Sequence, residues 1–430
     1  MNTKLRILMV SELYEPDPAA GQRVAEAASA LATQGHVVRV LARRRSGAET
    51  KSERNGVLVE RLWSPVEPGS GLIRKVVAAV WFELFAFFRT LLSGQPLDVL
   101  VTVSTPPMGH VAGVALSRLK GVTHVFWCAD VHPESLLAVG VLSPRRLPVR
   151  CLARLNRWAM GRCHTIIAVG RCMRDLLIAR GAPPEKVVIV TMWQRDRLAL
   201  APNPVLVQRL RSELGLDGRF VVMYSGNLGR MHHFETIVAA AQRLTRDAGF
   251  TFLFAGSGPG LDQLRAQANT RGLDRIVIHP LFSEEMLREA LALADVHVVT
   301  LRNSAAGVSV PGKLYGAMAA GRPVIFIGPE ESEVARTIRE EQCGFVVPAN
   351  DPEPLVKLLC QLRADPATRE LLGQRARAAF QTRYCQSRRC KEFSRAIERA
   401  VAESQPCGDE RWKSKPGPAD HPAQQNIEVF

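Results

Sequence analysis

The stretch Gly-Val-Ser-Val-Pro-Gly-Lys-Leu-Tyr at residues 307–315 has the residue types of a phosphate-binding loop. Its spacing agrees with the Walker A pattern G-x-x-x-x-G-K-[ST] up to Lys313, but Leu314 stands where that pattern needs a hydroxyl to bind magnesium. Pro311 also removes a backbone N–H group that a phosphate cradle would use. The loop therefore argues against a nucleoside triphosphatase. It leaves two interpretations, a phosphate site that uses Lys313 or a strand–helix turn with a solvated lysine.

Two further glycine-containing loops follow strand-like runs in the same half of the chain. The stretch 223–230 contains Gly226, Asn227, Gly229 and Arg230, and the stretch 254–260 contains Gly256 and Gly258. Loops at the carboxyl ends of parallel strands converge on the crevice where doubly wound sheets bind ligands. We therefore expect Arg230 and Lys313 to meet at one diphosphate, because both side chains bind phosphate oxygens well. None of the loops has the full G-x-G-x-x-G spacing, so the sequence does not favour NAD.

Short apolar runs rich in Val and Ile alternate with helical patterns along most of the 430 residues. A first series covers 6–10, 37–42, 99–104, 124–129, 165–170 and 187–192, and a second covers 220–226, 251–256, 276–280, 296–301, 323–328 and 345–348. Continuous apolar runs are typical of parallel strands that are buried on both faces. The expected fold class is α/β, with two doubly wound, Rossmann-like domains that face each other across a cleft.

The boundary between the two series lies at 195–206, where Ala-Pro-Asn-Pro cannot propagate a helix or a central strand. The stretch 366–402 has a helical pattern. We expect an N-terminal domain at 1–200, a C-terminal domain at 206–370, C-terminal helices at 371–403 that return to the first domain, and a disordered polar tail at 404–430.

The net charge of +15 and the nine dispersed Cys residues limit the partners and the compartment. A basic surplus favours nucleic acid, acidic lipid or phosphorylated metabolites. No zinc, helix-turn-helix or RNA-recognition signature accompanies the charge, so we expect no nucleic acid partner. No Cys-x-x-Cys occurs, which predicts reduced, mostly buried thiols and no metal site. The N-terminus lacks a signal-peptide pattern, and we expect a cytoplasmic protein.

The segment 72–92 is dense in large apolar residues, including Trp81 and Phe85. Charged residues such as Glu83 and Arg89 interrupt it, whereas a membrane-spanning helix needs about 20 nearly uncharged residues. Two interpretations remain: a buried crossover helix, or an interfacial helix whose apolar face contacts lipid. The basic charge elsewhere in the chain would assist peripheral contact with an anionic membrane through this segment.

Several of these motifs resemble one known family. The stretch VPGKLYGAMAAGRPVIF at 310–326, followed by GFVVPANDPEPL at 344–355, resembles the sugar-nucleotide-binding half of retaining family-4 glycosyltransferases of the GT-B fold. The stretches 7–42 and 224–230 resemble the first strand, loop and helix of the first domain and the first strand of the second domain. WCADVHPESLLAVG at 127–140 is similar to the D-x-x-P-E-S stretch of the branch that builds O-antigen and capsular polysaccharides. That branch includes fucosyl- and N-acetylfucosaminyl-transferases of O-antigen and colanic acid assembly.

The resemblance implies roles for individual residues. Arg230 and Lys313 would neutralise the donor's diphosphate as the nucleotide leaves, without a metal or another cofactor. The residues implied near the donor are Gly21, Gly226, Asn227, Gly229, Gly256, Gly258, Leu281, Val310, Leu314 and Tyr315. On the acceptor side, Asp130, His132 or Glu134 could position the acceptor hydroxyl or simply cap a helix. Retention would proceed by same-face attack, with the leaving phosphate accepting the acceptor's proton.

The sequence departs from this family at three positions. Many members carry two Glu separated by seven residues around the loop, and these positions are Val308 and Gly316 here. A His that often precedes the Asp of D-x-x-P is Ala129 here.

The departures leave three hypotheses open. The leading one is transfer of a hexose or deoxyhexosamine from a nucleotide-diphosphate sugar to a polyprenyl-diphosphate-linked saccharide, at the inner face of the cell membrane. The alternatives are a UDP-sugar 2-epimerase with the same architecture and a non-catalytic nucleotide-sugar-binding scaffold.

Overall fold

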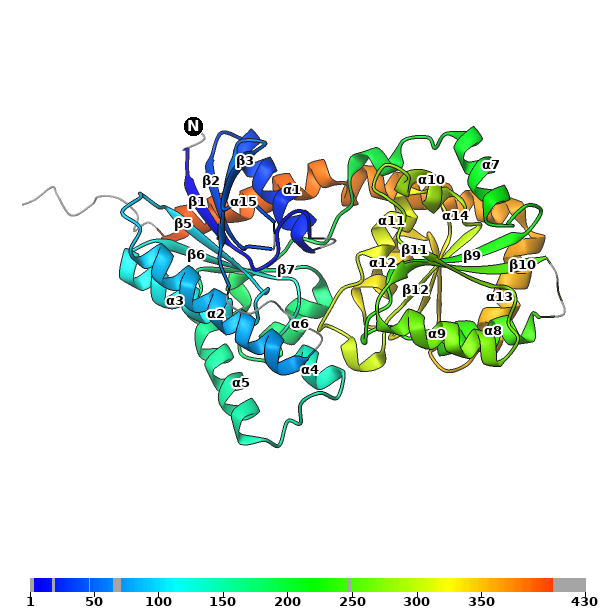
Figure 1. Cartoon of the computed structure of the whole chain (residues 1–430), viewed down its shortest axis with the longest axis horizontal. Coiled ribbons are helices and arrows are strands. Elements are labelled where there is room, and N and C mark those ends of the chain that lie inside the picture. Colours follow the sequence, from blue (N-terminus) through cyan, green and yellow to red (C-terminus); the bar gives the residue numbers. More distant parts are fainter. Residues whose placement is uncertain are drawn as a thin grey trace, which may run out of the picture.

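The computed structural model describes residues 4–17, 20–45, 47–64, 71–245, 247 and 249–404. These residues form two lobes, each built around one sheet (Figure 1). The first sheet has the strand order β3-β4-β2-β1-β5-β6-β7-β8, and the second has the order β11-β10-β9-β12-β13-β14. All neighbouring strands pair in parallel except β3 and β4. The predicted pair of doubly wound α/β sheets is confirmed.

Each strand except β3 coincides with an apolar run in the sequence. The strands of the first sheet are β1 (Arg6–Val10), β2 (Val37–Arg43), β3 (Lys51–Arg54), β4 (Val57–Leu62), β5 (Val99–Val103), β6 (Thr123–Cys128), β7 (Thr165–Ala168) and β8 (Val187–Ile189). Those of the second sheet are β9 (Phe220–Asn227), β10 (Phe250–Ser257), β11 (Ile276–Pro280), β12 (Val296–Thr300), β13 (Val324–Ile327) and β14 (Gly344–Val347). Central strands such as β5, β6 and β12 are buried at every residue, because helices cover both faces of their sheet.

The helices alternate with the strands. Those between the strands of the first sheet are α1 (Ala20–Thr33), α2 (Leu72–Leu91), α3 (Gly109–Lys120), α4 (Glu134–Ala138), α5 (Leu147–Met160) and α6 (Arg171–Ala179). The later helices are α7 (Pro204–Glu213), α8 (Glu235–Arg243), α9 (Pro259–Thr270), α10 (Leu287–Ala292), α11 (Lys313–Ala319), α12 (Glu333–Glu341), α13 (Glu353–Ala364), α14 (Pro366–Ala379) and α15 (Gln386–Ser404). Short 3-10 turns lie at Pro184–Lys186, Asp196–Ala199 and Asn303–Ala305, and a π-helical turn lies at Phe380–Tyr384.

Two chain segments cross between the lobes side by side. The backbone N–H of Gln194 donates to the carbonyl of Tyr384, and the N–H of Gln386 donates to the carbonyl of Gln194 at 2.9 Å. The helical pattern expected at 366–402 is therefore two helices, because the backbone is extended at Cys385 where it pairs with the other crossing segment. Beyond this break, α15 lies against α1, β6 and β7 of the first lobe (Figure 1).

The Ala-Pro-Asn-Pro stretch separates the two lobes in the sequence and also contains the start of α7. The side chain of Asn203 accepts hydrogen bonds from two backbone N–H groups of α7, and Pro204 is its first residue. At the other end of the chain, α15 continues to Ser404, and the rest of the tail that we expect to be disordered lies outside the described residues.

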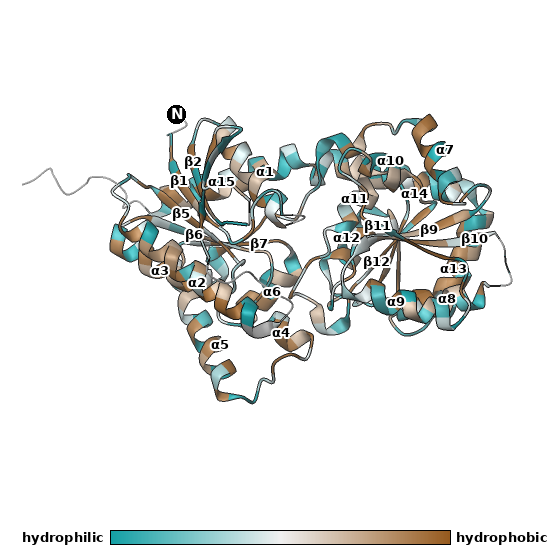
Figure 2. Ribbon diagram, in the orientation of Figure 1, coloured by the Kyte–Doolittle hydropathy of each residue, from teal (hydrophilic) through white to brown (hydrophobic). Residues whose placement is uncertain are grey.

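Helix α2 lies on the outside of the first lobe (Figure 2). Ala78, Phe82 and Ala86 are buried against the sheet and α3. Its opposite face carries exposed apolar side chains, which are Val76, Val77, Val80, Leu84, Phe85 and Phe88. Among the described residues, no helix combines the length and the apolar character that crossing a bilayer requires.

Candidate functional site

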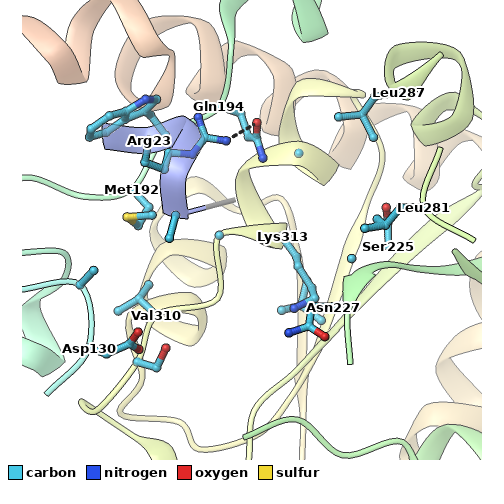
Figure 3. A pocket seen from close by; sticks show the side chains of 18 of the residues that line it. Arg23, Asp130, Met192, Gln194, Ser225, Asn227, Leu281, Leu287, Val310 and Lys313 are labelled. Atoms are coloured by element: carbon cyan, nitrogen blue, oxygen red, sulfur yellow. Dashed lines mark hydrogen bonds between the residues drawn. The ribbon is translucent and has the colours of Figure 1, made fainter. Parts of the chain in front are cut away.

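A cavity of about 350 Å³ lies in the cleft between the lobes. The first lobe lines it with the start of α1 and with residues at the carboxyl ends of β5 and β6. The second lobe lines it with the end of β9, with α10 and β12, and with the loop that leads into α11. Figure 3 shows side chains from both lobes pointing into this space. The carboxyl edges of both sheets thus meet at one ligand-sized cavity.

Among the residues that the structure describes, Lys313 is the only lysine that lines this cavity. It is the first residue of α11, and its side chain reaches back across the end of β9 (Figure 3). The Lys313 Nζ lies 3.0 Å from His232 Nε2 and 5.3 Å from the centre of the Tyr224 ring. Within the described residues, no carboxylate forms an ion pair with it. Burial lowers the pKa of Lys313 to about 7, so a nearby anion would stabilise the charged form of this amine.

Glycines allow the Lys313 side chain to lie against the backbone of β9. Gly226 has φ +119°, and a Cβ added there would lie 3.1 Å from Lys313 Cε. A Cβ on Gly256 would lie 2.1 Å from the carbonyl oxygen of Gly226, and one on Gly258 would lie 2.1 Å from Asn227 Oδ1. These three predicted donor-site glycines are therefore needed to pack two neighbouring loops closely.

Arg230 lines a second, neighbouring cavity instead of the one that contains Lys313. Its side chain is exposed, and the loop that carries it is held by Arg302, whose Nε donates to the carbonyls of Arg230 and His232 at 3.1 Å. Gly229 lines the same second cavity. His232 contacts both regions, because it lines the second cavity and touches Lys313. We expected Arg230 and Lys313 at one diphosphate. Both lie at the carboxyl edge of the second sheet, but they line adjacent cavities.

Asp130 faces the main cavity from the first lobe. It lines the main cavity and forms a backbone bridge with Ser309 of the second lobe, next to a hydrogen bond from the N–H of Val131 to the carbonyl of Val308 at 3.0 Å. The hydroxyl of Ser104 accepts hydrogen bonds from the backbone of Asp130 and the preceding residue. Burial raises the pKa of the Asp130 carboxyl to about 6, and the Ser309 side chain partly opposes this shift.

His132 and Glu134 lie near Asp130 in sequence but do not line the main cavity. His132 Nδ1 lies 2.5 Å from the hydroxyl of Ser135, and burial lowers the pKa of this imidazole to about 4. Glu134 is buried and forms an ion pair with Arg180 at 2.7 Å. Both side chains have partners within their own lobe, so Asp130 is the one of these three that faces the cleft.

The other residues predicted near the donor divide into two groups. Leu281 and Val310 line the main cavity, and Gly21 belongs to the first turn of α1, which also lines it. Leu314 and Tyr315 do not line it, because both are fully buried in the core of the second lobe. Both side chains instead pack α11 into this core.

The sequence-based expectations did not include the polar network on the hinge side of the cavity. Arg23 donates to Gln194 Oε1 at 2.8 Å (Figure 3). It also forms an ion pair with Glu26. Glu26 also accepts from Trp193 and from Arg195, and Arg195 continues to Glu284 of the second lobe in a chain of ion pairs. Apart from the local Arg23–Glu26 pair, nothing in the sequence of α1 indicates these contacts, since the other partners lie far along the chain.

Among the described residues, no group of three His, Cys, Asp or Glu side chains is arranged to hold a metal ion. The polar side chains that line the main cavity are instead Arg23, Thr105, Asp130, Gln194, Ser225, Asn227, His297, Ser309 and Lys313. Cationic and hydrogen-bonding groups of this kind suit a phosphorylated ligand.

Both lobes match known protein-family models. The "Glycosyl transferase 4-like domain" matches residues 19–193, and "Glycosyl transferases group 1" matches residues 219–365. Together the two matches cover more than half of the chain and include both walls of the cavity. This chain belongs to the GT-B glycosyltransferases.

Named relatives of this glycosyltransferase agree with that family. The "Probable glycosyltransferase WbjE" of Pseudomonas aeruginosa is 27% identical over 327 residues, which are 75% of this chain and 80% of the relative. WcaI of Escherichia coli K12, named as a colanic acid biosynthesis glycosyl transferase, is 24% identical over 377 residues, which are 84% and 91% of the two chains. The predicted resemblance to the O-antigen and colanic acid branch is confirmed.

Solved structures share the fold of this glycosyltransferase. Anabaena HepE, solved in complex with UDP, has a TM-score of 0.71 at 15% identity, over 92% of this chain and all of HepE. WaaG, a glycosyltransferase involved in lipopolysaccharide biosynthesis, has a TM-score of 0.69 at 18% identity, over 91% and 99% of the two chains. Both similarities support the GT-B architecture.

Of the two positions where many family members carry Glu, Gly316 lines the cavity in this glycosyltransferase, and Val308 directly precedes Ser309, which lines it. The carbonyl of Val308 accepts the hydrogen bond from Val131 across the cleft, while its side chain is buried. Gly316 lines the cavity next to Leu291, whose Cδ1 would lie 3.6 Å from an added Cβ. The cavity is therefore apolar at Gly316, where many family members carry a carboxylate.

Proposed function

We propose that this glycosyltransferase moves a hexose or deoxyhexosamine from a nucleotide-diphosphate donor, with retention, to a polyprenyl-diphosphate-linked saccharide in cell-surface polysaccharide biosynthesis. The observation that carries the donor assignment is the partly buried Lys313 ammonium, which has no carboxylate partner among the described residues and faces the interlobe cavity. The names of WbjE and WcaI support the biosynthetic setting, and the UDP complex of HepE supports a nucleotide ligand.

The donor diphosphate lies in this proposal beside the Lys313 ammonium, in the cavity that Gly226 and Gly312 also line. The nucleoside extends toward Leu281 and α10, and the sugar extends toward Asp130. Arg230 approaches from the neighbouring cavity and adds positive charge at the same loop edge. Positive charge at this point stabilises the phosphate as it becomes the leaving group.

Transfer with retention breaks the bond between the anomeric carbon and the phosphate oxygen, whose electrons stay on the phosphate. A bond then forms from the acceptor oxygen to the same face of the anomeric carbon, and the hydroxyl proton passes to the leaving phosphate. Asp130 orients the acceptor hydroxyl from the first lobe, since its carboxyl lines the cavity opposite the second lobe. His132 and Glu134 support the Asp130 loop through their own contacts.

The lipid-linked acceptor implies contact with a membrane, which we assign to α2. Its outward face is a stripe of apolar side chains, and Trp81 and Phe85 stack at 5.4 Å along it. Helix α3 packs beside α2, and α5 packs beside α3. Helix α5 exposes Leu155, Trp158 and several Arg residues, and Arg162 lies 4.7 Å above the Trp158 ring. The apolar side chains of α2 and the basic side chains of α5 suit the inner face of an anionic cell membrane.

The membrane assignment is tested by sedimentation with anionic and zwitterionic vesicles. The double variant F85S/F88S should bind anionic vesicles less than the wild type does, while V205S/L371S, which changes exposed residues of the second lobe, serves as the matched control. Equal vesicle binding by the wild type and F85S/F88S would reject α2 as the contact.

The donor assignment is tested by calorimetric titration with UDP, GDP and dTDP and with their sugars. Lys313→Met should lose at least tenfold in affinity for the nucleotide that the wild type binds, because a charged hydrogen bond is worth about 1.5–3 kcal/mol. Lys357→Met, which removes an exposed lysine on α13, should leave the affinity unchanged. A wild type that binds none of these nucleotides would refute the proposal.

The epimerase alternative gains no support from the relatives, which are named as glycosyltransferases. An epimerase would convert the donor sugar without a second substrate, whereas a transferase needs an acceptor for sugar transfer. A non-catalytic scaffold would bind the nucleotide and form no glycosidic bond with any acceptor. Mass spectrometry of the donor and of an added lipid-linked acceptor separates these outcomes.

A further inference from the structure

His232 has a fixed position beside the Lys313 ammonium. Its Nδ1 lies 2.6 Å from the backbone carbonyl oxygen of Thr300, at the end of β12. A carbonyl only accepts, so this nitrogen carries the proton, and the lone pair of Nε2 faces Lys313 Nζ at 3.0 Å. The contact therefore orients one N–H of the ammonium toward the imidazole.

The loop that carries His232 is itself held against the end of β12. The backbone N–H of Arg302 donates to the carbonyl of Met231 at 2.8 Å, and the Arg302 guanidinium donates to the carbonyl of His232 at 3.1 Å. The N–H of His233 donates to the hydroxyl of Thr300 at 3.3 Å. These bonds fix the imidazole before any ligand binds.

The partner of Lys313 is a neutral imidazole, and this affects how much of the lysine charge a ligand can use. A carboxylate at the same place would compensate the charge of Lys313 and compete with a phosphate for it. The charged and titratable groups that face His232 are Lys313, Arg302, His233 and Tyr224. Burial and the first three of these groups lower the pKa of His232 to about 3, so the imidazole stays uncharged under ordinary conditions. A neutral acceptor orients the ammonium and leaves its charge available.

We propose that His232 is a positioning residue that directs the Lys313 ammonium toward the donor's diphosphate without neutralising it. An ammonium has three N–H donors. One goes to His232, the Tyr224 ring covers another side, and the remaining direction is left to the interlobe cavity that Lys313 lines. This inference rests on the proposed donor function of Lys313 and adds a residue that is not part of any motif in the sequence.

The experiment compares His232→Phe, which keeps the bulk and removes the acceptor, with His232→Gln, whose amide oxygen can replace Nε2. Nucleotide diphosphate affinity is measured by calorimetry from pH 6 to 9 with the nucleotide that the wild type binds. We expect the Phe variant to lose roughly tenfold or more in affinity and the Gln variant to stay within about threefold of the wild type. In the Phe variant, the alkaline decline in affinity should also begin at lower pH, because the ammonium loses a stabilising acceptor.

A merely structural role for His232 predicts a different result. Both variants would then lose similar affinity, and the pH at which affinity declines would not move. Either finding would overturn the inference while wild-type binding still supported the donor site. A wild type without nucleotide affinity would refute the donor site as well. If the Phe variant does not fold, His232→Ala with added imidazole replaces it, and failure of imidazole to restore affinity would overturn the inference.

Discussion

Binding of a nucleotide diphosphate at pH 8 is expected to take up protons from solution, because Lys313 must become charged to meet the diphosphate. Burial lowers the pKa of Lys313 in the free protein to about 7. A bound diphosphate stabilises the ammonium and raises this pKa again. The phosphate groups are already fully ionised at pH 8, because their second pKa is about 6. The lysine therefore gains a proton that the ligand does not supply.

The size of the uptake follows from the fraction of neutral lysine. With a pKa of about 7, roughly nine-tenths of the Lys313 side chains are neutral at pH 8 and about one-tenth at pH 6. Binding should thus take up about 0.9 proton at pH 8 and about 0.1 at pH 6. The apparent dissociation constant should rise with pH above 7, by up to about fiftyfold between pH 7 and pH 9.

The assay is isothermal titration calorimetry in two buffers of similar pKa and different ionisation enthalpy. The difference between the observed enthalpies gives the number of protons taken up. Lys313→Arg is the first control, because a guanidinium stays charged at pH 8 and should abolish the uptake while keeping a cation. Asp130→Asn is the second, because the Asp130 carboxyl also lines the cavity and could take up a proton near an anion. Equal enthalpies in both buffers at pH 8 for the wild type would refute the reasoning.

Three further predictions concern stability and the cavity. Burial raises the pKa of Glu83 from 4.5 to about 8, so the folded protein binds this proton more tightly than the unfolded chain does, and stability should fall as pH rises through that window. Glu83→Gln should flatten this decline in thermal melts, and an unchanged slope would contradict the assignment. Burial raises the pKa of Asp130 to about 6, so this carboxyl is ionised at pH 7.5 at a cost in stability. Asp130→Asn should therefore raise the free energy of unfolding in urea by about 1–2 kcal/mol and lower the transfer rate at least tenfold. A lower free energy of unfolding in this variant would contradict the burial of a charged carboxyl. In Gly226→Ala, the alanine would have to adopt a positive φ, and its Cβ would displace the Lys313 side chain, so nucleotide affinity should fall about tenfold. An affinity equal to that of the wild type would show that the close packing of Lys313 on residue 226 does not matter for binding.

The strands and their order of appearance could be predicted because continuous Val and Ile runs reflect burial on both faces of a parallel sheet. The edge strand β3 could not, because its residues Lys51–Arg54 carry no apolar side chain and pair antiparallel with β4 at the surface. The break between α14 and α15 could not be predicted from the local sequence either. It depends on backbone pairing of Cys385 with Gln194, which is distant in the sequence.

What the sequence alone determined about the site is the set of local loops: glycines that permit unusual backbone, and Lys313 directly after one of them. These features depend on neighbours in the chain, so local patterns reveal them. The tertiary structure decided the partners. His232 meets Lys313 across 81 residues, and Arg23 meets Gln194 across 171. The structure also decided that Arg230 and Lys313 occupy adjacent cavities, since Arg302 fixes the loop between them. Such contacts arise only when the folded sheet brings distant strand ends to one edge, and no local pattern records which side chains then face each other.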